Sequence, residues 1–193
     1  MSYDQIIYDT AIKQGFTPTA AKLVVAQARF ESADYTSNVF KLNNNTSGMK
    51  YIGQPLATRG SLAPLNERSA TCRAGGVCVN SDHYAKFTSV QDSANDKIVR
   101  LYSKTMGGVT PEQLKNVKDA DEFALLLKRR SYYGFKKTPE TWGSEVRNYA
   151  NGLKAKLLKI NIIEVVKKNK GKFTIGLALV ISGLVWYFSI KKK

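Results

Sequence analysis

One glutamate near the N-terminus stands at a position suited to acid catalysis. Glu31 ends the run VVAQARFE, which consists largely of apolar and small residues, and small polar residues follow it. In a helix built from this run, apolar surroundings and the negative end of the helix dipole would raise the pKa of the carboxyl group. A carboxylic acid that stays protonated near neutral pH can donate to a glycosidic oxygen as that bond breaks. Glu31 is therefore a candidate general acid, with a solvated helix end as the simpler alternative.

The helix that carries Glu31 is expected to begin at Pro18. Thr17 is a suitable N-cap, and proline is favoured at the first position of a helix. Similar start signals recur before residue 150 and predict roughly five or six helices. They are Ser2 with Gln5, Ser89 with Asp92, Thr110 with Pro111, Asp121, and Thr138 with Pro139.

The helical period disappears between residues 51 and 87, where glycines and prolines separate short segments. Within this region the sequence RAGGVCV is typical of a tight hairpin turn. Cys72 and Cys78 flank the turn and either form a disulfide that closes it or remain two free thiols. Two cysteines and the single His83 are too few for a typical zinc site, so no metal is expected.

The C-terminal part has the features of a membrane anchor. Residues 173–190 contain no charged side chain, and as a helix they would span roughly 27 Å, close to the thickness of the bilayer's hydrocarbon region. Lysines flank this stretch, and Trp186, Tyr187 and Phe188 lie near its end, where aromatic residues often meet the membrane surface. Ahead of it, hydrophobic residues at helical spacing predict a long helix that leaves the globular domain toward the membrane: Trp142, Val146, Tyr149, Leu153, Leu157 and Ile160.

The net charge of +15 is concentrated beside this stretch. From residue 151 onward the chain contains ten lysines and one glutamate. Lysines next to a membrane span bind anionic lipid headgroups, so lipid rather than nucleic acid is the expected partner of these charges. A slight excess of lysines before the span favours a globular domain on the inner side. The N-terminus has no basic start followed by an apolar run, so no secretion signal is expected.

The segments AQARFESADYTS and NNNTSGMK resemble the core motif of glycoside hydrolase family 73. This family comprises N-acetylglucosaminidases of peptidoglycan with a lysozyme-like fold, and its usual pattern is AQAxxES-G-x-G-x-S followed by N-L-F-G-I-K. By this resemblance Glu31 is the catalytic acid, and residues 45–50 form a loop that shapes the cleft floor and places Asn45 and Gly48 at the substrate. The matching positions are Ala26, Gln27, Ala28, Glu31, Ser32, Ser37, Asn45, Gly48 and Lys50.

Looser similarities extend the resemblance toward Tyr149. Relatives carry a second glutamate in a hairpin after the acid, and Glu67 lies in the corresponding kind of segment. It would activate water or stabilise an oxocarbenium-like transition state, unless it is only a charged loop residue. In SYYGFKKTPETWGSEV, which is similar to an aromatic element of the family, Tyr132, Tyr133 and Trp142 either stack on sugar rings, support the acid or belong to the core. A third similarity, to the family segment F-x-x-Y-x-S-x-x-x-S with its following aspartate, involves Tyr84, Phe87, Ser89, Ser93 and Asp96.

The sequence also departs from the family pattern. The glycines that usually follow the Glu-Ser pair are replaced by Ala33, Asp34 and Tyr35, and the Leu-Phe pair of the loop is Thr46-Ser47. These changes keep the acid but predict a cleft of altered shape or substrate preference.

The sequence thus predicts a mainly helical, α+β fold of the lysozyme type. Residues 1–150 would form a helical bundle with a small β-hairpin lobe, 151–172 a basic helical connector, 173–190 a transmembrane helix and 191–193 a basic tail. The expected activity is cleavage of the peptidoglycan glycan strand without a cofactor. A lytic transglycosylase or muramidase on the same fold, or a non-catalytic glycan-binding or structural membrane protein, remains an alternative.

The expected location is the membrane, either of a phage virion or of a bacterial cell envelope. A phage particle that contains lipid would bring a lytic enzyme to the cell wall from outside, without a secretion signal. Its expected partners are peptidoglycan, the lipid bilayer through residues 173–190, and other components of the virion or membrane assembly.

Overall fold

The structure, a computed structural model, describes residues 1–134 and 142–160. The chain divides into two compact units, Met1–Ile160 and Asn161–Lys193, and the second lies outside the described residues. The first unit is dominated by helices and contains a small antiparallel sheet, which is the mixed α and β composition that the sequence predicts.

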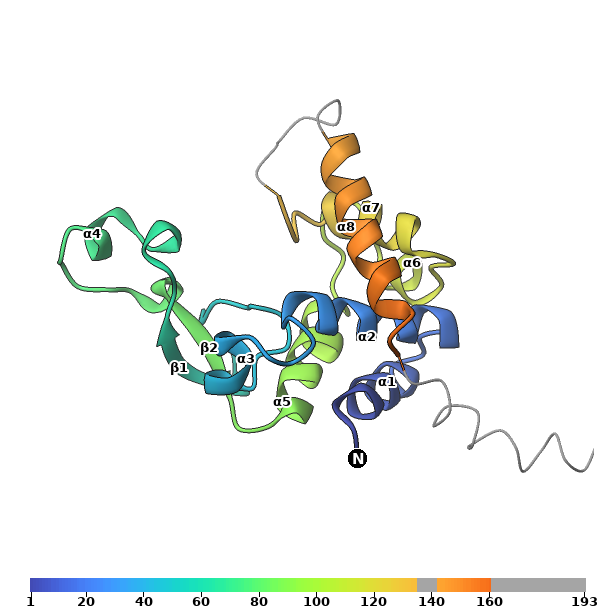
Figure 1. Ribbon diagram of the computed structural model, residues 1–193, viewed down its shortest axis with the longest axis horizontal. Coiled ribbons are helices and arrows are strands. Elements are labelled where there is room, and N and C mark those ends of the chain that lie inside the picture. Colours follow the sequence, from blue (N-terminus) through green and yellow to red (C-terminus); the bar gives the residue numbers. More distant parts are fainter. Residues whose placement is uncertain (135–141, 161–193) are drawn as a thin grey trace, which may run out of the picture. The chain divides into compact units, whose positions relative to one another are not determined.

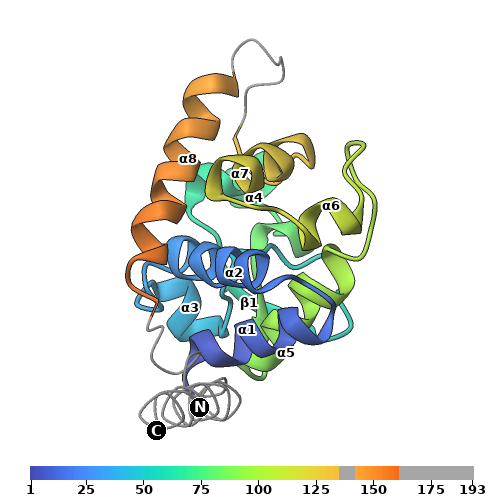
Figure 2. The ribbon, with the colours of Figure 1, turned by 90° about the vertical axis from the view of Figure 1, so that its right-hand side faces the viewer.

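Helix α2, Pro18–Glu31, is the centre of the helical core. It packs between α1, Tyr3–Lys13, and α8, Trp142–Leu157, while α7, Ala120–Arg129, packs on α8 (Figure 1 and Figure 2). Every residue from 23 to 28 is buried, because neighbouring elements cover this part of α2 on all sides. The helix is therefore a fixed base for the glutamate at its end. The shorter helices include α3, Asn38–Asn43, α4, Ala70–Arg73, α5, Val90–Asn95, and α6, Pro111–Lys115.

Most of the predicted helix N-caps are present in the structure. In four helices the predicted cap side chain accepts a hydrogen bond from a backbone N–H in the first turn. Helix α7 begins earlier than predicted, because Asp119 rather than Asp121 accepts from the N–H of Glu122. Residues 138 and 139 lie outside the described part of the chain. The four caps are Ser2 of α1, Thr17 of α2, Ser89 of α5 and Thr110 of α6.

The two strands, β1, Ala57–Leu62, and β2, His83–Phe87, pair antiparallel. Their register shifts within β1, where Gly60 lies against α3. A Cβ atom on Gly60 would come within 2.3 Å of Oδ1 of Asn43, so only glycine permits this close approach. With the segment that connects the strands, the sheet forms a lobe to one side of the helices, called the β lobe below (Figure 1).

The prediction of a tight hairpin at RAGGVCV is wrong. The hairpin strands are instead β1 and β2, and the long segment 63–82 between them contains α4 and two short 3-10 helices, Leu65–Glu67 and Asn80–Asp82. The glycines of RAGGVCV follow α4 rather than joining two strands, since the preceding residues close a helical turn. Composition identified a turn here but not what it connects.

The Cys72–Cys78 disulfide closes this segment, with the two Cα atoms 4.5 Å apart. Asp82 fastens the base of the same loop, because its buried carboxylate accepts bonds from the backbone N–H and hydroxyl of Ser69 and from the N–H of Val79. Asp82 and the two sulfur atoms lie within 4.8 Å of one another. The sulfurs are bonded to each other, however, so this cluster offers no thiolate to a metal.

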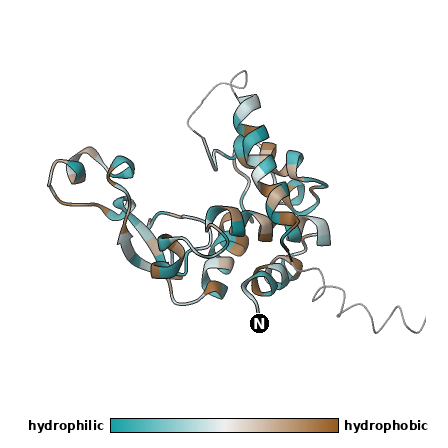
Figure 3. Cartoon of the chain, viewed as in Figure 1, coloured by the Kyte–Doolittle hydropathy of each residue, from teal (hydrophilic) through white to brown (hydrophobic). Residues whose placement is uncertain are grey.

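Helix α8 packs on the domain rather than leaving it, contrary to the prediction. Tyr149, Ala150 and Leu153 are buried in the core, and the compact unit continues to Ile160, past the expected boundary at residue 150. Among the described residues, no helix is long and apolar enough to cross a membrane. Figure 3 shows that these helices mix hydrophilic and hydrophobic residues along their lengths. The predicted span at 173–190 lies outside the described residues.

Candidate active site

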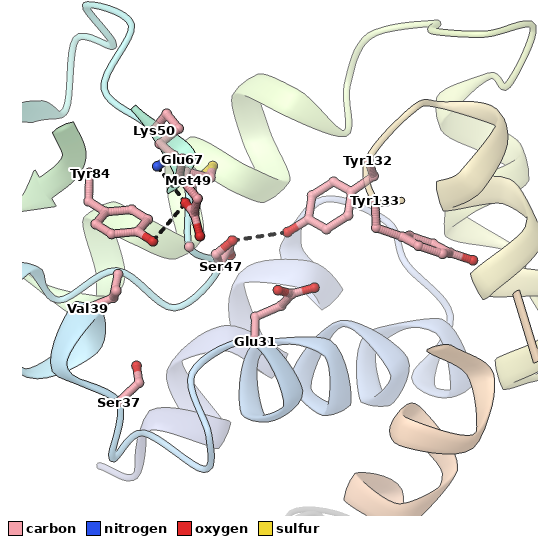
Figure 4. A pocket seen from close by; sticks show the side chains of 11 residues that line it. Glu31, Ser37, Val39, Ser47, Met49, Lys50, Glu67, Tyr84, Tyr132 and Tyr133 are labelled. Carbon is pink, nitrogen blue, oxygen red and sulfur yellow. Dashed lines mark hydrogen bonds and ion pairs between the residues drawn. The ribbon is translucent and has the colours of Figure 1, made fainter. Parts of the chain in front are cut away.

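Glu31 is positioned by the end of α2 and by a tyrosine of α8. Helix α2 ends at Glu31, with Ser32 as its C-cap. The Tyr149 hydroxyl donates a hydrogen bond of 2.5 Å to Oε1 of Glu31. Figure 4 shows the carboxyl group directed away from α2 and toward Tyr132. The acid predicted from the sequence is therefore held between packed elements and is not a solvated helix end.

A chain of buried hydrogen bonds fixes the direction of the tyrosine that reaches Glu31. The Tyr102 hydroxyl donates to Oε1 of Gln27 at 2.5 Å, and Nε2 of Gln27 donates to the Tyr149 hydroxyl at 3.2 Å. Because the Tyr149 oxygen accepts from Gln27, its own proton is free to point at Glu31. Gln27, one of the motif positions, therefore acts on Glu31 through Tyr149.

Burial is the main influence on the pKa of Glu31. Desolvation raises that pKa, while the hydrogen bond from Tyr149 and the charge of Lys97 oppose the shift, and the net direction is upward. Burial also raises the pKa values of Tyr149 and Tyr132 well above that of an ordinary tyrosine. Both tyrosines thus remain hydrogen-bond donors at neutral pH, and Glu31 holds its proton to higher pH than an ordinary glutamate does.

A buried lysine, Lys97, also lies on this side of the cleft, and no sequence motif identified it. It lies in a π-helical turn, Asp96–Leu101, and its side chain is 2% exposed. Its Nζ lies 5.7 Å from the centre of the Tyr132 ring. Burial lowers the pKa of Lys97 to about 7, and the charge of Glu31 opposes that shift. Turns of π type often occur at functional sites, and this one turns a lysine inward toward the Tyr132 ring.

Glu67 is in a different environment, on the β lobe. Its Oε2 pairs with Nζ of Lys50 at 2.7 Å and accepts a hydrogen bond from the Tyr84 hydroxyl at 3.1 Å. The bond from Lys50 is the main cause that lowers the pKa of Glu67, and Tyr84 adds to it. The side chain is 43% exposed, so Glu67 is an ionised carboxylate in contact with solvent.

A cleft of about 470 Å³ contains both carboxyl groups. Figure 4 shows Glu31 on the helical side and Glu67 across the opening, with Ser47 between them. The loop 45–50 forms part of the floor through Ser47, Gly48 and Met49, as the family resemblance implies. The remaining lining side chains are Ser37, Val39, Lys50, Tyr84, Tyr132 and Tyr133.

Tyr132 and Tyr133 both line the cleft, in agreement with their prediction as candidate substrate contacts. The Tyr132 hydroxyl donates to the carbonyl of Ser47 at 3.4 Å, which links the end of α7 to the cleft floor. The Tyr133 ring stacks on Tyr149 with centroids 4.0 Å apart, and its hydroxyl donates to the carbonyl of Ala124. These residues therefore combine a wall position with a packing role.

Asn45 shapes the floor without reaching the cleft. It is fully buried, and its amide donates to the carbonyls of Met49 at 2.8 Å and Ala85 at 3.0 Å. The neighbouring Thr46 N–H donates to the hydroxyl of buried Ser93, so two of the family-like segments meet here. The Asn45 side chain therefore has a structural role rather than the predicted contact with substrate, because its polar atoms already bond to backbone groups.

Trp142 also lies away from the two carboxyl groups. It begins α8 and lines a separate groove of about 430 Å³ with Asp121, Leu125 and Arg129 of α7. Trp142 is not among the residues that line the cleft with Glu31 and Glu67, and its contact with a sugar stays a prediction. Sequence similarity to an aromatic element could not specify which side of α8 the indole would occupy.

The residues that replace the family's glycines adopt left-handed backbone conformations. The φ angles of Ala33, Asp34 and Tyr35 are 51°, 56° and 66°, a region that costs a non-glycine residue on the order of 1 kcal/mol. Tyr35 donates a hydrogen bond of 2.7 Å to Asp4, and Asp34 pairs with Lys156 of α8 at 2.8 Å. These contacts stabilise the bend after Glu31, so the turn shape that glycine would permit is retained with other residues.

The residues that sequence reasoning missed share one property: each acts on Glu31 from a distant segment. Tyr149 had appeared only as part of a hydrophobic period, and Lys97 had not appeared at all. No sequence signal indicated its inward-facing amine, because the burial of its neighbours Asp96 and Ile98 is visible only in the structure. Comparison with known proteins gives no match to a family model, a curated protein or a solved structure.

Proposed function

We propose that this protein is a glycoside hydrolase that cleaves the glycan strand of peptidoglycan, with Glu31 as general acid. One observation carries the proposal: a single cleft contains two carboxyl groups whose pKa values are shifted in opposite directions. Such a pair is the usual requirement for glycosidic bond cleavage, because one group must donate a proton while the other stays ionised. The choice of peptidoglycan rests on the resemblance of the Glu31 and loop motifs.

In the first step Glu31 transfers its proton to the glycosidic oxygen while the bond from that oxygen to C1 breaks. The departing sugar leaves with a free hydroxyl, and positive charge develops on C1 and the ring oxygen. Glu31 becomes a carboxylate, and the Tyr149 hydroxyl already donates to its Oε1. The hydrogen bond strengthens as charge develops, so it lowers the energy of the transition state more than that of the starting state.

In the second step water adds to C1 and gives up one proton. Glu67 is suited to accept that proton or to stabilise the positive charge, because Lys50 and Tyr84 hold it ionised. Both of these contacts involve Oε2, and neither uses Oε1. The product has a hydroxyl at C1 and therefore a new reducing end. By the family resemblance the sugar at this end is N-acetylglucosamine. The resemblance also implies a lysozyme-like arrangement of the helices and the β lobe.

A lytic transglycosylase is the second candidate, and the ion pair of Glu67 favours it. A carboxylate engaged by Lys50 is a weaker base than a free one, whereas a transglycosylase needs only one acid and base group. In that reaction Glu31 would protonate the glycosidic oxygen and then remove a proton from the 6-hydroxyl of muramic acid, which closes onto C1. The product would be a 1,6-anhydro sugar and no water would be consumed.

Membrane association belongs to the same proposal. Its support is the uncharged stretch 173–190 with its flanking lysines, and a lipid-containing phage particle or a bacterial envelope is the proposed location. Separation of membranes from soluble fractions before and after deletion of 173–190 tests this part alone.

Mass spectrometry of fragments released from purified peptidoglycan tests the activity. N-acetylglucosamine at the new reducing end supports the proposed reaction, and muramic acid there identifies a muramidase. A 1,6-anhydro product identifies a transglycosylase. If the wild-type chain releases no fragments from any wall preparation, the enzymatic proposal is overturned and a glycan-binding or structural role takes its place.

A further inference from the structure

Lys97 is an unusual lysine because its charge has no hydrogen-bond partner. Within residues 1–134 and 142–160, its Nζ is the buried side-chain polar atom left without such a bond. The side chain is 2% exposed, and Nζ lies near the faces of two tyrosine rings, 5.9 Å from the centre of Tyr102 and 5.7 Å from that of Tyr132. Isolated buried cations are costly, so a retained one calls for an electrostatic partner.

The groups around Lys97 leave Glu31 as that partner. Tyr102, Tyr132 and Tyr149 interact electrostatically with Glu31 as well, but burial raises the pKa of each, so all three are neutral near pH 7. Arg130, whose guanidinium lies 5.8 Å from the centre of the Tyr102 ring, donates to the backbone carbonyls of Leu101, Lys104 and Val109 and bears the same charge sign as Lys97. The buried carboxylate of Asp96, next to Lys97 in the chain, pairs with Arg100. Among the described residues, Glu31 is thus the group whose negative charge acts on Lys97.

We propose that Lys97 is a positioning residue for the acid, whose ammonium group balances the Glu31 carboxylate that forms after proton transfer and thereby limits the pH range over which Glu31 stays protonated. This inference rests on the proposed function of Glu31 as the general acid. Lys97 is buried against the Tyr132 ring and does not line the cleft, so it acts through Glu31 and does not touch the substrate.

Glu31 and Lys97 each stabilise the charged form of the other. A carboxylate at Glu31 favours the ammonium form of Lys97, and the ammonium favours the carboxylate, so the two titrations are coupled. When Glu31 has donated its proton, Lys97 stabilises the resulting charge. When Glu31 takes up a proton again, Lys97 can lose its own to solvent, because its pKa lies near 7.

The sign of the expected effect separates this role from mere packing. The charge of Lys97 lowers the pKa of Glu31, so its removal in Lys97→Met raises that pKa. The alkaline limb of the kcat/KM profile then moves to higher pH in the same direction. A purely structural lysine would change stability or overall activity and leave the position of this limb unchanged.

The experiment uses the full-length chain in detergent, with the side-chain carbons of glutamate labelled for NMR titration. We expect a higher pKa for Glu31 in Lys97→Met than in the wild type. Lys128→Met is the matched control, because Lys128 is equally buried but pairs with Glu145. An unchanged or lower Glu31 pKa in Lys97→Met overturns the inference.

A reciprocal measurement serves if Lys97→Met does not fold. In Glu31→Gln, which is nearly isosteric, loss of the carboxylate should lower the pKa of Lys97, observed through its labelled Cε. An unchanged Lys97 pKa again overturns the inference. The NMR readouts do not depend on activity, so they fail separately from the proposed function: a wild-type chain that cleaves no glycan removes the catalytic role, whereas absent coupling removes only that of Lys97.

Discussion

The two sides of the cleft treat a carboxyl group in opposite ways. On the helical side, Glu31 ends a buried helix, and desolvation raises its pKa against the effects of Tyr149 and Lys97. On the β lobe, Glu67 is partly exposed, and its pairing with Lys50 lowers its pKa. The same type of side chain thus has a raised pKa in one wall and a lowered pKa in the other, and the cause is the surroundings rather than the residue type.

The two sides also differ in how their carboxyl groups are held in place. Glu31 is held by core residues of α2 and α8, whose positions depend on tight packing. Glu67 lies in a short 3-10 helix of a lobe that is fastened by a disulfide and by Asp82. Substitutions on the helical side should therefore act through the protonation of Glu31, and substitutions on the β lobe through the ionisation of Glu67.

The largest effect is expected for Glu31→Gln. The amide keeps the shape and can still accept from Tyr149, but it has no proton to donate, and loss of general acid catalysis costs roughly 10²–10⁴-fold. Zymography on purified peptidoglycan and kcat measurements provide the readout. A fully active variant would contradict the enzymatic assignment.

The same variant should be more stable than the wild type at neutral pH. The folded state raises the pKa of Glu31, so it binds a proton that the unfolded chain releases, and stability falls as pH rises through the unfolded value toward the folded one. Glutamine does not ionise, so Glu31→Gln avoids this loss of stability at high pH. Thermal unfolding at pH 4 and pH 8 should show a gain only at the higher pH.

Glu67→Gln should have a smaller effect, with a distinct pH signature. The wild-type kcat/KM profile is expected to be bell-shaped, with an acid limb from Glu67, whose pKa is lowered, and an alkaline limb from Glu31, whose pKa is raised. Glu67→Gln removes the acid limb and leaves the alkaline one. If activity and both limbs are unchanged, the single-carboxylate transglycosylase gains support.

Tyr149→Phe should reduce kcat by about 10- to 100-fold, since a hydrogen bond to a charged group contributes roughly 1.5–3 kcal/mol. The lost bond lowers the pKa of Glu31 in the wild type, so its removal also moves the alkaline limb to higher pH. Tyr84→Phe is the matched change on the β lobe. It raises the pKa of Glu67 and should move only the acid limb upward, so an alkaline shift in Tyr84→Phe would break the separation of the two walls.

Local signals in the sequence identified most helix starts on the helical side and were poor for the β lobe. The N-caps of α1, α2, α5 and α6 depend on residues three positions apart, so they could be identified directly. The strand pairing joins residues separated by the whole segment 63–82, and the tight turn at RAGGVCV was the wrong local solution. Pairing at long range is set by packing that no short pattern encodes.

The same limit applies within the candidate site. Glu31 was predicted from a motif of adjacent residues, and its pKa shift from the apolar helix beneath it. Its partners, Tyr149 and Lys97, come from α8 and from the turn after α5, and neither segment has a local pattern that identifies the contact. The positions of the Asn45 and Trp142 side chains could not be predicted either, because similarity of sequence did not determine which way they face.

The smallest expected effect compares the end of α2 with the end of α4. Ala33 follows α2 with a φ of 51°, whereas Ala74, the C-cap of α4 in the β lobe, has a φ of −81°. Ala33→Gly removes a left-handed strain and should raise the free energy of unfolding by about 0.5–1 kcal/mol, despite the greater freedom of glycine in the unfolded chain. Ala74→Gly relieves no strain and should lower it by up to about 1 kcal/mol. Urea denaturation of the two variants at one pH measures both changes. If Ala33→Gly destabilises the protein as much as Ala74→Gly does, the bend after Glu31 is not strained.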